Sequence, residues 1–134
     1  MPGVHDIFMR RCLALAKLAL GNVAPNPMVG AVLVHQGKII GEGYHKKFGE
    51  AHAEVNCIAN AEMYLAQASS RHRQQIIGES IMYVSLEPCT HFGKTPPCAD
   101  LLIGKGITKV IIGSVDSFPG VNGRGIAKLM ASDI

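Results

Sequence analysis

Residues 52–54 read His-Ala-Glu, and residues 87–98 read Glu-Pro-Cys-Thr-His-Phe-Gly-Lys-Thr-Pro-Pro-Cys. A fold that uses both stretches must bring together one imidazole, His52, and two thiols, Cys89 and Cys98. These are donor groups that zinc prefers, and three of them leave the fourth position of a tetrahedral ion open to water. Zinc lowers the pKa of such a water to roughly 7. Glu54 lies close enough in sequence to exchange a proton with it, so the pattern predicts a catalytic zinc centre with Glu54 as general acid and base.

Two other interpretations of these residues stay open on spacing alone. A structural zinc has four protein ligands, and Cys12 or Cys57 could supply the fourth, although both fall where a packing role is expected. The residues could also bind no metal. Zinc-dependent base deaminases usually carry their two thiols as Cys-x-x-Cys, whereas eight residues separate Cys89 from Cys98 here.

The composition indicates one globular domain. The chain has 134 residues, 48% of them hydrophobic, which is enough for a sizeable core. The net charge of +3, with four Phe, three Tyr and no Trp, does not give the basic, aromatic surface typical of nucleic-acid binders. No secretory signal or membrane-spanning apolar run is visible. Four cysteines, two of them in a ligand pattern, favour a reducing cytoplasm over a disulfide scaffold. We therefore expect no nucleic-acid or membrane partner.

Hydrophobic periodicity predicts helices alternating with strands. The prolines on either side of Asn26 exclude helix there, and Gln36-Gly37 predicts a tight hairpin turn. We expect residues 69–78 to be an irregular, solvated extension without an assigned function. The predicted helices cover residues 5–20, 52–68, 96–104 and 126 onward, and the predicted strands cover residues 28–35, 38–45, 80–86 and 108–115. Together they predict an α/β fold, a three-layer α/β/α sandwich with a mixed central sheet.

Three further polar residues are candidates for substrate binding, each with a simpler alternative. Asn26, held between two prolines, could present its amide to a base or could only form a turn. His45, at the end of a strand, is on its position alone a surface residue. Lys94 could hold a phosphate as a point charge, or it could be an ordinary exposed lysine.

The long insert between Cys89 and Cys98 resembles that of the pyrimidine deaminases of riboflavin biosynthesis, a family with the cytidine-deaminase type of fold. Residues 24–32, Ala-Pro-Asn-Pro-Met-Val-Gly-Ala-Val, are similar to the opening loop and strand of that family. Residues 41–45, Gly-Glu-Gly-Tyr-His, are similar to its second strand. The resemblance covers nearly the whole chain, and the insert distinguishes this family from cytidine, guanine and tRNA-adenosine deaminases.

The resemblance implies a substrate and a set of site residues. The substrate would be 2,5-diamino-6-ribosylamino-4(3H)-pyrimidinone 5′-phosphate, which loses its 2-amino group as ammonia. The cofactor would be Zn²⁺ and the catalytic residue Glu54. The implied metal ligands are His52, Cys89 and Cys98, and the implied substrate contacts are Asn26 on the pyrimidine ring, His45 in the pocket, and His91 and Lys94 on the sugar-phosphate side.

Several expectations are left open by the sequence. In bifunctional members of the family a reductase domain follows the deaminase domain, whereas this sequence of residues 1–134 stops where a fifth strand would begin. The sequence is compatible with a shortened protein, with part of a longer protein or with a protein that has only the deaminase domain. A homo-oligomer is compatible with the sequence but cannot be derived from it. The alternative functions are deamination of another free base, nucleoside or tRNA base, and a non-catalytic zinc-binding module.

Overall fold

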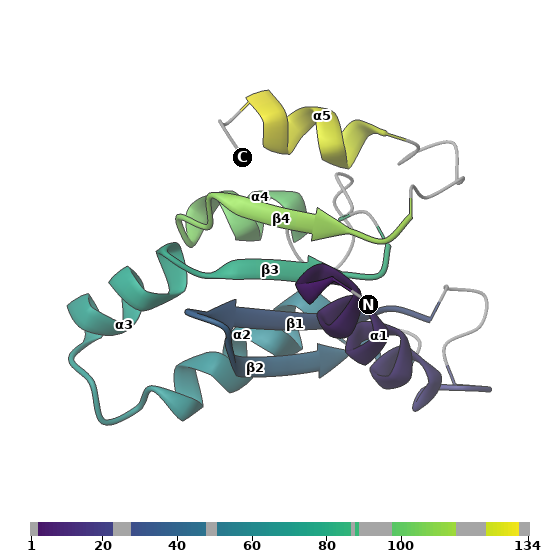
Figure 1. The fold of residues 1–134 in the computed structure, drawn as a ribbon, viewed down its shortest axis with the longest axis horizontal. Helices are drawn as coiled ribbons and strands as arrows, with labels where there is room; N and C mark the ends of the chain where they lie inside the picture. The colour runs from purple at the N-terminus through teal and green to yellow at the C-terminus, as the bar shows by residue number, and fades with distance from the viewer. Residues whose placement is uncertain are drawn as a thin grey trace.

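A computed structural model describes residues 3–22, 28–47, 51–86, 88, 98–114 and 123–131 (Figure 1). In chain order the elements are α1 (Val4–Lys17), β1 (Gly30–His35), β2 (Lys38–Tyr44), α2 (Ala53–Tyr64), α3 (Ser70–Gly78), β3 (Ile81–Val84), α4 (Cys98–Gly104), β4 (Lys109–Ile112) and α5 (Arg124–Ala131).

The four strands form one mixed sheet in the order β2-β1-β3-β4. Strand β1 is antiparallel to both of its neighbours, and β3 is parallel to β4. Helix α4 lies between β3 and β4 in sequence, as a crossover between parallel strands requires. The predicted hairpin is confirmed, because Gln36 and Gly37 both have positive φ angles, 51° and 79°, at the tight turn between β1 and β2.

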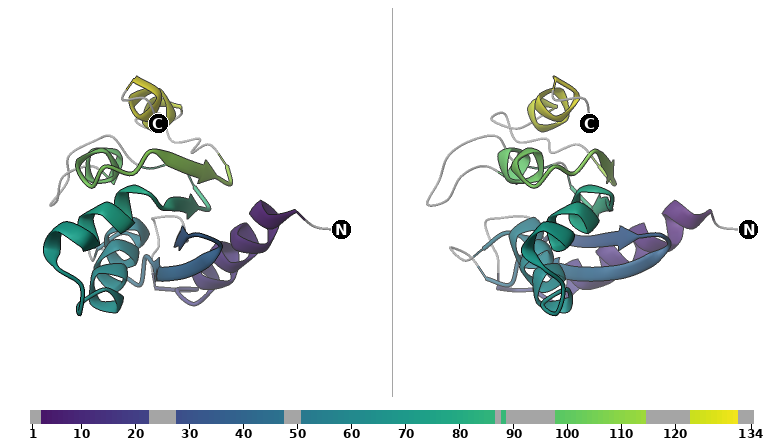
Figure 2. Two further views of the ribbon diagram at one scale, coloured as in Figure 1. Left: turned by 60° about the vertical axis from the view of Figure 1, so that its left-hand side comes forward. Right: turned by 90° about the vertical axis from the view of Figure 1, so that its left-hand side faces the viewer.

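Helices cover both faces of the sheet, as the left view of Figure 2 shows for α1 and α2. On one face, Cys12 and Leu15 of α1 pack in a cluster with Val32, Val34 and Tyr83. On the other face, residues of α2, α3, α4 and α5 pack with a second set of strand residues, which are Ala31, Leu33, Ile40, Met82 and Val84. Alternate β1 residues thus enter different clusters, and the predicted three-layer fold is confirmed.

The prediction for residues 69–78 was wrong, because most of this segment is helix α3. Its composition is polar, but local hydrogen bonds support a helix: the Ser69 hydroxyl caps the first turn by accepting from the His72 amide at 3.1 Å. Near the other end Ile77 is buried in the core. One cap and one anchored side chain therefore hold a helix that shows little hydrophobic periodicity.

Several predicted boundaries also shift. The helix predicted to reach residue 68 ends at Tyr64, and His52 is its N-cap rather than part of its first turn. The last helix begins at Arg124, before the predicted start. The strands are shorter than predicted by one to four residues. In the described segments, no helix combines the length and the apolar character needed to span a membrane.

Strand β2 and helix α2 approach each other closely at two glycines. A Cβ atom added to Gly43 would lie 2.3 Å from the Cys57 amide nitrogen and 2.6 Å from the Ala53 carbonyl oxygen. One added to Gly41 would lie 2.6 Å from the Cys57 carbonyl oxygen. Only glycine permits this spacing. The contact fixes the start of α2, and with it His52, against the end of β2.

Candidate active site

His52 and Cys98 meet at the beginnings of two neighbouring helices. His52 is the N-cap of α2, with an extended backbone (φ −72°, ψ 166°). Cys98 is the first residue of α4 and is 2% exposed. The His52 Nδ1 atom and the Cys98 Sγ atom lie 3.4 Å apart. Two of the donor groups predicted from the sequence are therefore together in space.

The spacing of these two donor atoms suits a tetrahedral zinc ion. Zn–S bonds of about 2.3 Å and Zn–N bonds of about 2.0–2.1 Å, at a tetrahedral angle, place sulfur and nitrogen about 3.5 Å apart. The observed separation is 3.4 Å. An imidazole nitrogen and a thiol are also the correct donor types. The described part of the site thus fits zinc in both chemistry and spacing.

Glu54 lies in the first turn of α2 and is 4% exposed. A carboxylate at that place interacts favourably with the partial positive charge and the unpaired amides of the helix start. Its burial limits contact with bulk water, as expected of a group that exchanges protons with a reacting molecule. Glu54 follows His52 by two residues, so both belong to the same end of one helix.

His45 is buried rather than at the surface. Its side chain is 3% exposed, which contradicts the expectation from strand position alone. The His45 Nδ1 atom lies 3.1 Å from the Ala51 carbonyl oxygen, which can only accept, so this nitrogen carries a proton. The ring packs edge-on against the His52 ring, with centroids 5.2 Å apart and planes at 84°. A role in substrate binding stays a prediction for His45.

The other predicted site residues, Asn26, Cys89, His91 and Lys94, lie outside the described residues. Pro88, which precedes Cys89, is fully buried. Among the described residues no group of three His, Cys, Asp or Glu side chains is arranged to hold a metal. The predicted ligand set needs Cys89 as its third member, and the set of three ligands therefore stays a prediction.

Cys12 and Cys57 have packing environments of their own. Both are fully buried, and their Sγ atoms lie 3.4 Å from the Tyr83 carbonyl oxygen and 3.5 Å from the Gly41 carbonyl oxygen, respectively. Cys12 belongs to the cluster on the α1 face of the sheet, opposite the face covered by α2 and α4. Burial raises the pKa of the Cys12 thiol to about 12 and raises that of Cys57 as well. The contacts of both thiols with backbone carbonyls argue against a four-ligand structural site.

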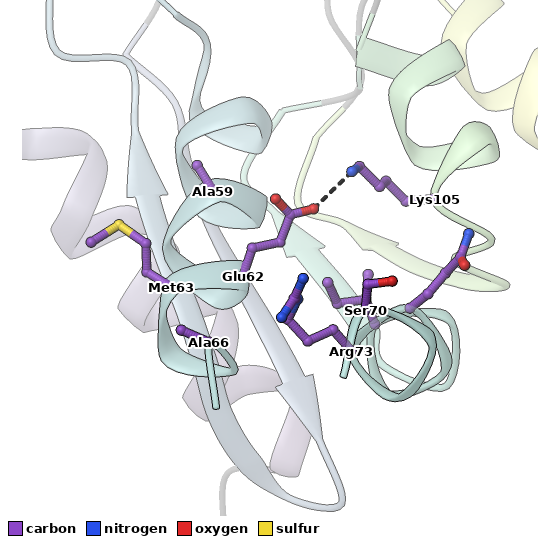
Figure 3. Close-up of a pocket in the computed structure, with 9 residues that line it drawn as sticks. Ala59, Glu62, Met63, Ala66, Ser70, Arg73 and Lys105 are labelled. Atoms are coloured by element: carbon purple, nitrogen blue, oxygen red, sulfur yellow. Dashed lines mark hydrogen bonds and ion pairs between the residues drawn. The ribbon is translucent and has the colours of Figure 1, made fainter. Parts of the chain in front are cut away.

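A cavity of about 620 Å³ lies at the opposite end of α2 from His52. Figure 3 shows Glu62 and Lys105 facing each other across it, with a 2.7 Å ion pair between Oε1 and Nζ. Its remaining lining residues are Ala59, Met63, Ala66, Ser70, Arg73, Gln74 and Ile77. None of them is a predicted site residue, so this cavity is separate from the site of His52 and Cys98.

Sequence reasoning missed Asn56, one helical turn after His52. Its Nδ2 atom lies 2.9 Å from the Tyr44 carbonyl oxygen and 3.3 Å from the Ala51 carbonyl oxygen. Asn56 thus contacts both ends of the segment that connects β2 to α2. The sequence signal for Asn56 was its place as a polar residue four positions after the predicted ligand His52. Its hydrogen-bond partners could not be predicted, because they depend on how β2 packs against α2.

The chain is similar to known proteins over most of its length. The family model of the cytidine and deoxycytidylate deaminase zinc-binding region matches residues 3–114. The riboflavin biosynthesis protein RibD of Actinobacillus pleuropneumoniae is 47% identical over 127 residues, which are 95% of this chain and 31% of that protein. The diaminohydroxyphosphoribosylamino-pyrimidine deaminase of Buchnera aphidicola subsp. Schizaphis graminum is 45% identical over 127 residues, 95% of this chain and 78% of that protein.

A solved structure is also similar over nearly the whole chain. The diaminohydroxyphosphoribosylaminopyrimidine deaminase/5-amino-6-(5-phosphoribosylamino)uracil reductase from Thermotoga maritima is 44% identical, with a TM-score of 0.84. The alignment covers 98% of this chain and 35% of that one. This chain therefore spans about a third of the length of the RibD and deaminase/reductase relatives, and most of the length of the Buchnera deaminase.

Proposed function

Because the chain belongs to the family of the cytidine and deoxycytidylate deaminase zinc-binding region, we propose that residues 1–134 form a zinc-dependent deaminase domain of riboflavin biosynthesis. The substrate is 2,5-diamino-6-ribosylamino-4(3H)-pyrimidinone 5′-phosphate. Water replaces its 2-amino group, which leaves as ammonia. The names of the relatives support this choice of substrate.

The observation that carries the proposal is the 3.4 Å separation of His52 Nδ1 and Cys98 Sγ beside the buried Glu54. His52, Cys98 and Cys89 would hold the zinc ion. When bound, zinc would lower the pKa of a water molecule and so make it a nucleophile at neutral pH. Three protein ligands leave room for that water, as in other catalytic zinc sites.

Glu54 moves the protons of the reaction. Its carboxylate accepts a proton as the water oxygen adds to the amine-bearing ring carbon, and it then donates a proton to the departing nitrogen. The bond that forms joins oxygen to the ring carbon, and the bond that breaks joins that carbon to the amino nitrogen. Burial of Glu54 near the start of α2 keeps the carboxylate at a fixed position for both transfers.

The remaining predicted residues recognise the substrate. Asn26 hydrogen-bonds the pyrimidine ring, His45 lines the pocket, and His91 and Lys94 contact the sugar-phosphate side. Burial of His45 against the His52 ring supports its assignment. We place the domain in the cytoplasm, because four cysteines, two of them in a ligand pattern, fit a reducing compartment.

Ammonia release tests the proposal directly. The zinc-loaded protein is incubated with the diaminopyrimidine ribosyl phosphate and, in parallel, with cytidine and with guanine. Release from the first substrate alone is expected. Faster release from cytidine or guanine would establish a deaminase of different specificity, and no release from any of them would contradict the proposal.

X-ray absorption at the zinc edge separates the proposal from a non-catalytic zinc module. A catalytic centre made by His52, Cys89 and Cys98 has two sulfur, one nitrogen and one oxygen neighbours. A third sulfur in place of the oxygen would indicate a closed, structural site. The buried positions of Cys12 and Cys57 favour the first result.

A further inference from the structure

The connection between β2 and α2 is held at its described ends by hydrogen bonds to the backbone carbonyls of Val29, Tyr44 and Ala51. It leaves the sheet at Tyr44, carries His45, and returns at Ala51, immediately before His52. The His45 amide donates to the Val29 carbonyl oxygen at 3.1 Å, and its ring donates through Nδ1 to Ala51. The Ala51 carbonyl thus accepts the hydrogen bond of the His45 ring and directly precedes His52 in the chain. Its position therefore influences where both histidine side chains lie.

Asn56 binds both ends of this segment with one amide group. Its Nδ2 atom donates to the Tyr44 carbonyl at 2.9 Å and to the Ala51 carbonyl at 3.3 Å. Both partners are carbonyl oxygens, which only accept, so the NH₂ group of the amide must face them. The Asn56 backbone amide also donates to the His52 carbonyl oxygen at 3.1 Å. Asn56 thus ties the residues on both sides of the segment to the first turn of α2.

We propose that Asn56 is a positioning residue for the zinc site, and that it acts by donating hydrogen bonds to the Tyr44 and Ala51 carbonyls. The Ala51 carbonyl then orients His45 through its Nδ1 proton, and the His45 ring packs against the His52 ring. His52 is thereby held with Nδ1 toward Cys98 before the metal binds. Groups that hydrogen-bond directly to a metal ligand typically contribute 10–100-fold to metal affinity. Asn56 acts on His52 through Ala51 and His45, so we expect its contribution at the lower end of that range.

Asn60 offers a matched control on the same helix. It lies one turn beyond Asn56, and its Nδ2 atom donates to the Glu42 carbonyl oxygen of β2 at 2.6 Å. Asn60 therefore also ties α2 to β2, and among the described residues its side chain hydrogen-bonds Glu42 rather than Tyr44 or Ala51. Substitution of either asparagine removes a hydrogen bond between α2 and β2. Only substitution of Asn56 also removes the contacts that position His45 and His52.

The test measures zinc affinity by competition with a chromophoric chelator for wild type, Asn56→Ala, Asn56→Asp and Asn60→Ala, with the fold of each checked by circular dichroism. We expect zinc to bind about 10-fold more weakly in both Asn56 variants and unchanged in Asn60→Ala. Asn56→Asp matters because it keeps the shape of the side chain but places a carboxylate, which cannot donate, against two carbonyls.

The inference rests on the proposed zinc site, and the outcomes distinguish failure of the inference from failure of the proposed function. Wild type that binds no zinc would contradict the proposed function and, with it, the role of Asn56. Wild type that binds zinc, with both Asn56 variants equal to it, would overturn only the inference. Wild-type affinity in Asn56→Asp would show that the residue acts by packing. An equal loss in Asn60→Ala would show only a general link of α2 to β2.

Discussion

His52 Nδ1 and Cys98 Sγ lie 3.4 Å apart, although 46 positions separate the two residues in the chain. The contact arises because α2 and α4 lie side by side on one face of the sheet and begin at the same end. At the opposite ends of these helices, the carboxylate of Glu62 and the ammonium group of Lys105 form a 2.7 Å ion pair. The packing of two helices thus creates a site that neither sequence stretch contains alone.

Glu54→Gln should abolish most activity and leave zinc binding intact. The amide keeps the size of the buried side chain but cannot accept the proton, and general acid–base catalysis is typically worth about 100- to 10,000-fold. Ammonia release and zinc content are measured on the same sample. Glu62→Gln, on the exposed part of the same helix, is the control and should retain activity. Near-normal turnover in Glu54→Gln would remove Glu54 from the mechanism.

Gly43→Ala should destabilise the protein. The new methyl group would meet the Cys57 amide nitrogen at 2.3 Å and the Ala53 carbonyl oxygen at 2.6 Å, both of them backbone atoms of α2. Forcing the strand and the helix apart costs about 1–3 kcal/mol or more in the free energy of unfolding, measured by urea denaturation. Gly104→Ala is the control, because a Cβ there meets nothing within 4 Å. Equal stability of the two variants would contradict the close packing of β2 on α2.

The buried thiols should make stability fall at alkaline pH. Burial raises the pKa of Cys12 from 9.0 to about 12 and raises that of Cys57 from the same ordinary value. Below about pH 9 both thiols are protonated in the folded and unfolded chains, so they add no pH dependence. Above it the unfolded chain loses these protons first. The thiol contribution to the free energy of unfolding therefore decreases as the pH rises toward about 12.

Comparison with the double variant Cys12→Ala, Cys57→Ala isolates this effect from the titration of lysines and tyrosines. The difference in the free energy of unfolding between wild type and the variant should shrink from about pH 8 to about pH 10. A difference that stays constant over this range would mean that the two thiols are accessible to solvent in the folded protein.

Lys94→Ala should weaken binding of the phosphorylated substrate much more than that of its dephosphorylated form. A lysine that holds the phosphate contributes a charge-assisted hydrogen bond that the dephosphorylated compound cannot make. The KM values of both substrates are compared in the variant and in Lys38→Ala, whose lysine lies over the Tyr64 ring. An equal loss for both substrates would remove Lys94 from the phosphate site.

The sheet was predictable because its signals are local. The turn residues Gln36-Gly37 and the apolar run Ile81–Val84 indicate strands without reference to the rest of the chain, and both were confirmed. Helix α3 was missed because its residues are mostly polar and show little apolar periodicity. The Ser69 cap is a local signal, whereas the burial of Ile77, which also stabilises the helix, depends on the rest of the fold.

The site was predictable in its chemistry but not in its supporting contacts. The residue types at positions 52, 54 and 98 indicate zinc and a proton carrier, because these chemical properties belong to the side chains themselves. The burial of His45 and the two hydrogen bonds of Asn56 depend on where the Tyr44 and Ala51 carbonyls lie after β2 packs on α2. The residue types and their spacing indicated the zinc ligands and the proton carrier, and the resemblance added the substrate. For the contacts of Asn56 the sequence offered only a polar residue four positions after His52.

The origin of the oxygen in the product tests the central claim most directly. The zinc-loaded protein is supplied with the diaminopyrimidine ribosyl phosphate in water enriched in heavy oxygen, and the product is examined by mass spectrometry. Hydrolytic deamination predicts one solvent oxygen on the ring carbon that lost its amino group, and ammonia in equal amount. A product without solvent oxygen, or substrate recovered unchanged from a zinc-loaded sample, would contradict it.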